Sequence, residues 1–161
     1  MAYEAKQPGR KLLIWLGVGW PLLPSEGNGM SGRDSAAIFH NIVWLSTKLR
    51  EGRITLYNVD PGLSGAYYYE QFLKGVGSAK IVQDGNLGIQ VLAIQSGGLV
   101  LNRSNDLGDS LASCLEDAKD YYILSFDAPA AGHADEYHSL QLKIARPRLT
   151  ARSRTGYYVQ P

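Results

Sequence analysis

The sequence predicts an α/β domain with a parallel strand-helix-strand unit and a C-terminal antiparallel strand pair. A short apolar run and a second strand-like segment flank an amphipathic segment, which predicts the strand-helix-strand unit of a parallel sheet. Period-two alternation near the C-terminus predicts strands with one wet face. The 161 residues suit a single domain, 1–161, long enough to bury a core without disulfides.

The strand-helix-strand unit occupies residues 11–59. Residues 11–18, KLLIWLGV, form a continuous apolar run, typical of a strand buried on both faces. After a Gly-rich loop we expect Asp34 or Ser35 to cap a helix that ends at Gly52. Its apolar face comprises Ile38, Ile42, Leu45 and Leu49. Residues 54–59 predict the second strand, closed by the turn Asp60-Pro61-Gly62.

The second half begins with predicted helices at 66–76 and 86–98, followed by a brief strand at 99–101. Cap-type residues at 104–106 then introduce another amphipathic helix. In this helix we expect Leu111 and Leu115 to be core residues and Cys114 to be small, buried and unreactive. Residues 120–129 and 138–147 predict the antiparallel pair, and 149–158 a last short strand.

The composition argues against a disordered chain, a nucleic-acid-binding protein and a membrane-spanning protein. With 45% hydrophobic residues, 19% charged residues and a net charge of +1, the chain is globular and has no nucleic-acid footprint. Its one basic patch is interpreted as a solvated strand face, and it comprises Lys143, Arg146, Arg148, Arg152 and Arg154. The longest apolar run, LLIWLGVGWPLL, is too short for a membrane span and contains Gly and Pro. The single cysteine does not decide the compartment.

No local pattern predicts catalytic machinery or a cofactor. HADEYH places His133, Asp135, Glu136 and His138 close together, and these are metal-ligand residue types. Their spacing matches no zinc pattern, so we interpret the segment as a polar hairpin loop. GVGWPL at 17–22 resembles the start of a dinucleotide fingerprint, but it lacks the third Gly and the helix directly behind the turn.

Exposed aromatic residues and a strand end predict a recognition surface. Tyrosine offers contact area with a polar tip, and the chain has ten tyrosines, several of them clustered. Asp60 ends a strand, where α/β folds place ligand-contacting residues, although turn chemistry ahead of Pro61 is the preferred explanation for it. The candidate binding residues are Trp20, Asp60, Tyr67, Tyr68 and Tyr69.

Several segments together carry a family resemblance: GRKLLIWLGVGWPLL, ITLYNVDPG, VLAIQSGGLVLNRSNDL, LEDAKDYYILSFDAP and LKIARPRLTARSRTGYY. In this order they resemble the C-terminal portion of the von Willebrand factor A-related domain found mostly in acidobacterial proteins. The resemblance covers most of the chain, and the closing Arg-x-Gly-Tyr-Tyr is its most specific part. It implies a Rossmann-like (vWA-like) sandwich with a mostly parallel sheet and helices on both faces. It also implies a binding module in place of an enzyme.

The sequence departs from the family pattern at the metal site. Metal-binding A domains use an Asp-x-Ser-x-Ser motif, which this chain lacks, and Val18-Gly19 stands where Asp-Gly is expected. An apolar side chain cannot ligate a hard cation, so no metal site is carried over. The resemblance places the motif-bearing strand upstream of Met1, so we expect an N-terminally truncated domain. Export of many family members implies an extracytoplasmic home if the chain is a fragment, and a cytoplasmic one if it is not.

These observations lead to a metal-independent protein-interaction or scaffold module. The alternative is an α/β hydrolase-like enzyme that uses Asp60 with His133 or His138. The strand edge from Lys11 to Gly17 would lack its neighbour in an A domain, and an exposed apolar edge recruits another chain or is covered. We therefore expect this edge to pair across a two-fold axis with a second copy, or with the chain's own C-terminal strands as the lesser alternative.

Overall fold

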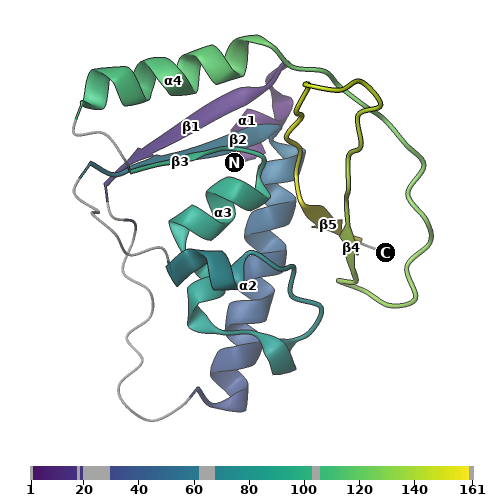
Figure 1. Cartoon of the computed structure of the whole chain (residues 1–161). Helices are drawn as coiled ribbons and strands as arrows, with labels where there is room; N and C mark the ends of the chain where they lie inside the picture. The colour runs from purple at the N-terminus through teal and green to yellow at the C-terminus, as the bar shows by residue number, and fades with distance from the viewer. Residues whose placement is uncertain (1, 18, 20–29, 62–67, 103–105, 160–161) are drawn as a thin grey trace.

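A computed structural model of the chain describes residues 2–17, 19, 30–61, 68–102 and 106–159. It has a three-stranded parallel sheet in the order β1-β2-β3 and a separate two-stranded antiparallel sheet, β4-β5 (Figure 1). The strands span Lys11–Leu16 (β1), Ile54–Val59 (β2), Val100–Leu101 (β3), Tyr137–Ser139 (β4) and Gly156–Tyr158 (β5). This arrangement confirms the α/β class and the parallel sheet.

The β2 strand is the centre of the parallel sheet. It pairs with β1 from Lys11↔Ile54 to Leu16↔Val59, and with β3 through Asn58↔Val100. All of its residues are buried, including the polar Thr55 and Asn58, so β2 shows none of the in-out alternation of a half-exposed strand. By contrast, β1 is an edge strand of this sheet and only partly buried, so the expectation that it is buried on both faces is wrong.

The long helix α2, Gly32–Glu51, connects β1 to β2. The Ser31 side chain accepts a hydrogen bond from the Asp34 backbone N–H, while the Asp34 side chain accepts one from the Ser31 backbone N–H. Ser31 is therefore the cap and Asp34 its partner in a capping box, which corrects the prediction that Asp34 or Ser35 is the cap. The helix ends at Gly52, as predicted.

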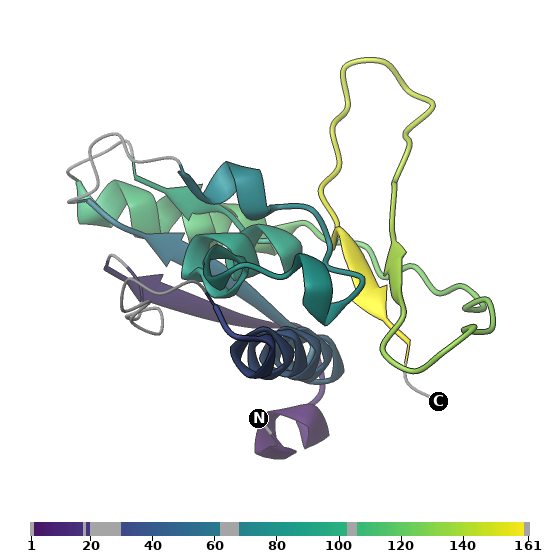
Figure 2. The same ribbon diagram turned by 90° about the horizontal axis from the view of Figure 1, so that it is seen from below.

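Helices cover both faces of the sheet (Figure 2). On one face α2 and α3, Ile89–Gln95, enclose a cluster of Leu56, Ile89, Leu92 and Ala93, with Leu45 packed against it. On the other face α4, Leu107–Lys119, covers a cluster of Tyr57, Val59 and Cys114. The short helices are α1, Ala2–Lys6, and the 3-10 turns at Tyr68–Phe72 (η1), Ala79–Ile81 (η2) and Asp84–Leu87 (η3).

The helix predictions between residues 66 and 98 hold only in part. Residues 68–72 form a 3-10 turn, and the expected helix over 86–98 divides into η3 and the shorter α3. The α3 helix ends before Gly97, whose φ of +86° suits glycine. The next residue, Gly98, lies so close to the Leu56 carbonyl oxygen that a Cβ would clash with it. The chain therefore passes directly over β2 at this point.

The α4 helix confirms one core prediction and corrects another. Cys114 is fully buried and Leu111 is half-buried, but Leu115 is 57% exposed. Leu115 lies about 100° from Cys114 around the helix axis. The sheet covers only one side of α4, so the face carrying Ser110 and Cys114 is buried and Leu115 lies outside it. The expectation that Leu115 is a core residue is wrong for this geometric reason.

The C-terminal strands pair differently from the prediction. Residues 120–129 form no strand, and β4 pairs with β5 through Tyr137↔Tyr158 and His138↔Tyr157. The last predicted strand thus exists, but its partner is the start of the 138–147 segment. Alternation predicts that a segment suits a strand, whereas a strand also requires an adjacent edge to pair with. The small sheet packs on α2 through Tyr158, which joins Ile38 and Ile42 in one cluster.

None of the helices in the described ranges has both the length and the apolar composition required to cross a membrane.

Candidate functional site

The carboxyl ends of the three parallel strands meet at one edge of the sheet (Figure 1). Asp60 directly follows β2 there, is 2% exposed, and donates its backbone N–H to the Leu101 carbonyl at 2.9 Å. Asn58 is fully buried beside it and donates through Nδ2 to the carbonyls of Trp15 and Gly17, at 3.3 and 2.9 Å. Asn58 therefore ties the end of β1 to β2, a role that its place inside an apolar run did not indicate.

The predicted recognition surface is described only in part. Trp20 and Tyr67 lie outside the described residues, as does Val18 at the position of the expected metal-site departure. Tyr68 opens η1 and Tyr69 is half-buried within it, in a turn that packs against α3 and η3. Asp60 does follow a strand end, but it is buried, so the recognition surface around these residues stays a prediction.

The HADEYH segment forms a small polar cluster at the start of β4. Glu136 accepts a hydrogen bond from the Gly132 N–H at 2.6 Å and contacts His138 Nε2 at 3.0 Å. The Gly132 N–H, and to a lesser extent His138, lower the pKa of Glu136, while desolvation opposes them. His133 points to its neighbour's carbonyl in an exposed turn. The described residues hold no group of three or more His, Cys, Asp or Glu side chains that could bind a metal.

The hydrolase-like alternative requires Asp60 beside His133 or His138. Asp60 follows the carboxyl end of β2, whereas His138 lies in β4. Figures 1 and 2, at right angles to each other, both place β4 on the opposite side of the molecule from that end of β2. His138 contacts Glu136 and the Tyr157 hydroxyl, the latter at 3.5 Å. The fold therefore gives no support to this acid-base pair.

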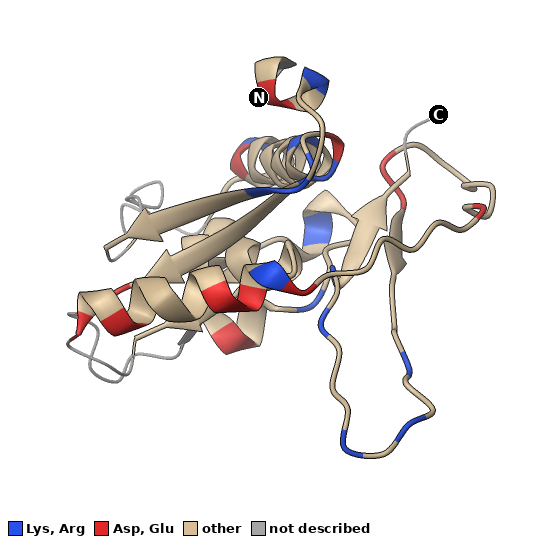
Figure 3. Cartoon of the chain, turned by 90° about the horizontal axis from the view of Figure 1, so that it is seen from above, with Lys and Arg blue, Asp and Glu red and all other residues tan. Residues whose placement is uncertain are grey.

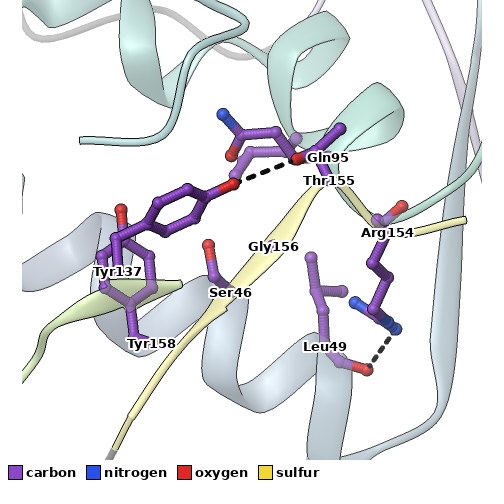
Figure 4. A pocket seen from close by; sticks show the side chains of 10 residues that line it. Ser46, Leu49, Gln95, Tyr137, Arg154, Thr155, Gly156 and Tyr158 are labelled. Carbon is purple, nitrogen blue, oxygen red and sulfur yellow. Dashed lines mark hydrogen bonds between the residues drawn. The ribbon is translucent and has the colours of Figure 1, made fainter. Parts of the chain in front are cut away.

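A pocket lies between α2, α3 and β5, and Figure 4 shows its lining side chains. Its volume is about 20 Å³, room for about one water molecule. Arg154 closes one side by donating to the carbonyls of Leu49 and Ile54, at 3.1 and 2.7 Å. Burial lowers the pKa of this guanidinium to about 10, with Arg50 and Arg10 adding to the shift. The pocket thus belongs to the packing of β5 on the helices and has no room for an organic substrate.

A second polar network lies under α4. The Tyr57 hydroxyl donates to Asp117 Oδ2 at 2.7 Å and accepts from Arg10 at 3.0 Å. Arg10 also donates to Thr55 Oγ1, and Arg152 forms an ion pair with Asp117. Burial, helped by the hydrogen bond to Asp117, raises the pKa of Tyr57 to about 12. The network joins the residue before β1, the centre of β2, α4 and the C-terminal segment.

The outer edge of β1 is the most exposed apolar part of the main sheet. Lys11 donates its N–H to the carbonyl of Arg53, just before β2, and Gly17 donates its N–H to the carbonyl of Val59 in β2. In a parallel ladder alternate residues face alternate neighbours, so the backbone groups of Leu12, Ile14 and Leu16 point to the other side. On that side no described strand pairs with β1, and the C-terminal strands form their own sheet. The Leu16 side chain is 54% exposed.

A second apolar surface lies at residues 121–126. Its ends are anchored, since the Tyr121 ring lies 5.6 Å from the Arg10 guanidinium and the Phe126 ring lies 5.8 Å from the Tyr157 ring. Between these anchors Tyr122, Ile123 and Leu124 are exposed. The segment forms no helix or strand, carries no charge and is rich in residues of high β-propensity, which are features of segments that add to open edges.

Together the fold and these surfaces define a small α/β domain with exposed apolar surfaces, and the pocket between α2, α3 and β5 has no substrate-sized space. Comparisons with family models, with curated proteins and with solved structures each return no match. The case for a function therefore depends on the geometry and on the sequence resemblance.

Proposed function

We propose that this chain is a non-enzymatic, metal-independent interaction or scaffold module, of the von Willebrand factor A-related type that its sequence resembles. The observation that carries the proposal is the open, apolar edge of β1. Its partner is a second copy of the chain, which would extend the parallel sheet by strand addition. The pocket between α2, α3 and β5 has room for about one water molecule. This small volume favours binding through a surface over turnover of a substrate in that cavity.

The β1 edge lacks the features that protect natural sheet edges. Charged side chains, proline and bulges are the usual protections. Residues 12–16 carry neither charge nor proline, and Lys11 is turned away to the carbonyls of Gln7 and Gly52. No described strand pairs with the outer side of β1, so the backbone groups of Leu12, Ile14 and Leu16 can pair with an added strand. Each net hydrogen bond would contribute about 0.5–1.5 kcal/mol.

Self-pairing about a two-fold axis brings the two β1 strands together antiparallel. The arrangement would join two three-stranded sheets into one continuous sheet. The exposed leucines, Leu13 on one face of the sheet and Leu16 on the other, would then be covered by their symmetry mates.

Light scattering coupled to size-exclusion chromatography tests this proposal. The wild-type chain is expected to elute as a dimer whose fraction rises with concentration. Leu16→Lys places a charge on the edge at an exposed position, so it is expected to abolish the dimer without unfolding the chain. Ile81→Lys is the matched control, because Ile81 is equally exposed but lies in η2. A wild-type monomer at all concentrations, or equal loss in both variants, would contradict the proposal.

A further inference from the structure

The segment between β4 and β5 forms a projecting loop, which we call the C-terminal arm and define as residues 140–153. It extends away from the sheets and helices (Figure 2). Every residue from 141 to 153 is exposed. We propose that the C-terminal arm docks onto the surface of an anionic lipid bilayer, with its basic residues at the headgroups and its apolar residues in the interface.

The charge of the arm is of one sign. No Asp or Glu occurs from residue 137 to the C-terminus, whereas Lys143, Arg146 and Arg148 all lie in the arm. None of these three makes an ion pair with any residue that the structure describes. Acidic residues gather instead on α4 (Figure 3). The arm is therefore the part of the molecule that a negatively charged surface would attract.

Apolar side chains alternate with these charges. Leu142, Ile144 and Leu149 are 42%, 40% and 57% exposed. A partner recognised only through charge would gain nothing from exposed leucines, and a nucleic-acid site would be expected to offer aromatic residues for stacking. The arm has no aromatic residue. Basic and apolar side chains on one exposed segment match the bilayer interface, which accepts both.

The base of the arm is fixed although its tip is exposed. The Leu140 N–H donates to the Thr155 carbonyl at 2.8 Å and continues the β4-β5 ladder. Arg152 donates to the Gly97 carbonyl at 2.8 Å and pairs with Asp117 on α4. The tip turns at residues 147–148, where Arg148 has a φ of +66°. The folded body therefore presents the tip at a defined place, and only the tip needs to meet the membrane.

Co-sedimentation of the full chain with unilamellar vesicles tests the proposal. Vesicles of phosphatidylserine and phosphatidylcholine are expected to bind the chain, and vesicles of phosphatidylcholine alone are not. Each basic residue near such a surface contributes enough that Arg146→Glu with Arg148→Glu should weaken partitioning at least about thirty-fold. Leu149→Ser should weaken it roughly ten-fold, because the apolar contact is lost. Raising the salt concentration should release the wild-type chain.

Arg33→Glu with Lys80→Glu is the matched control, since it makes the same change in net charge at exposed sites outside the arm. This variant and Leu16→Lys are expected to bind vesicles like the wild type. The experiment therefore tests membrane docking by the C-terminal arm separately from dimerisation through β1. Equal binding to both vesicle types, equal loss in the Arg33 control, or no effect of Leu149→Ser together with tight heparin binding would each overturn the proposal.

Discussion

Replacing Tyr57 by Phe removes a single hydroxyl from the network under α4. That hydroxyl donates to Asp117 at 2.7 Å and is fully buried with the rest of its side chain. A hydrogen bond to a charged group contributes about 1.5–3 kcal/mol, so the free energy of unfolding should fall by about 2 kcal/mol. Urea denaturation followed by circular dichroism measures this as a midpoint lowered by about 1 M with an unchanged slope.

The loss of unfolding free energy in Tyr57→Phe should depend on pH. Burial opposes ionisation of Asp117, but hydrogen bonds from Arg152 and Tyr57 outweigh it and lower its pKa from the ordinary 3.8. A lowered carboxyl pKa contributes stability above the ordinary value, and this is lost as the pH falls through the folded-state pKa. The difference between wild type and Tyr57→Phe should therefore be full at pH 7 and shrink below about pH 4.

Tyr158→Phe is the matched control for this experiment. Tyr158 is buried as well, but its hydroxyl donates to the neutral Val76 carbonyl at 3.0 Å. Its removal should cost about 0.5–1.5 kcal/mol at every pH, because no charge is involved. A loss below about 0.5 kcal/mol for Tyr57→Phe at pH 7, or the same pH dependence in both variants, would refute the assigned role of Asp117.

Three further predictions concern the core and the absence of metal chemistry. Cys114 should resist thiol reagents in the native state, because burial, with a smaller contribution from Asp117, raises its pKa; fast native labelling would contradict the fold of α4. Leu92→Ala should lower the free energy of unfolding by about 2–5 kcal/mol and Leu115→Ala by less than about 0.5, and equal losses would show that the faces are misassigned. Calorimetric titration with magnesium, manganese or calcium should give no saturable heat at micromolar levels, and a stoichiometric site would refute the metal-independent role.

Local patterns predicted the elements that depend on local chemistry. The strand at Ile54–Val59 was predicted with its observed bounds, because a short segment rich in β-branched and aromatic residues before an Asp-Pro-Gly turn is typical of a strand. The end of α2 at Gly52 follows from the loss of helix propensity at glycine. Its start was misplaced because Ser31 and Asp34 are both good caps, and only their reciprocal hydrogen bonds show which one precedes the helix.

Features that depend on distant neighbours could not be predicted. The Tyr57–Asp117 hydrogen bond joins residues 60 positions apart, and no spacing rule links them. Alternation at 120–129 indicated a strand, but nothing local shows whether an edge lies beside it. Asn58 was overlooked because it sits in an apolar strand, although a buried amide in such a run is itself a signal that it bonds to neighbouring backbone.

Amide hydrogen exchange of β1 at two protein concentrations tests the central claim most directly. The Lys11 and Gly17 amides bond to the carbonyls of Arg53 and Val59 within one chain, so their protection should not change with concentration. The amides of Leu12, Ile14 and Leu16 face the open edge, and the account predicts that they exchange rapidly in dilute solution and become protected as the dimer forms. Rapid exchange of these three amides at every concentration, with the chain monomeric throughout, would contradict the account.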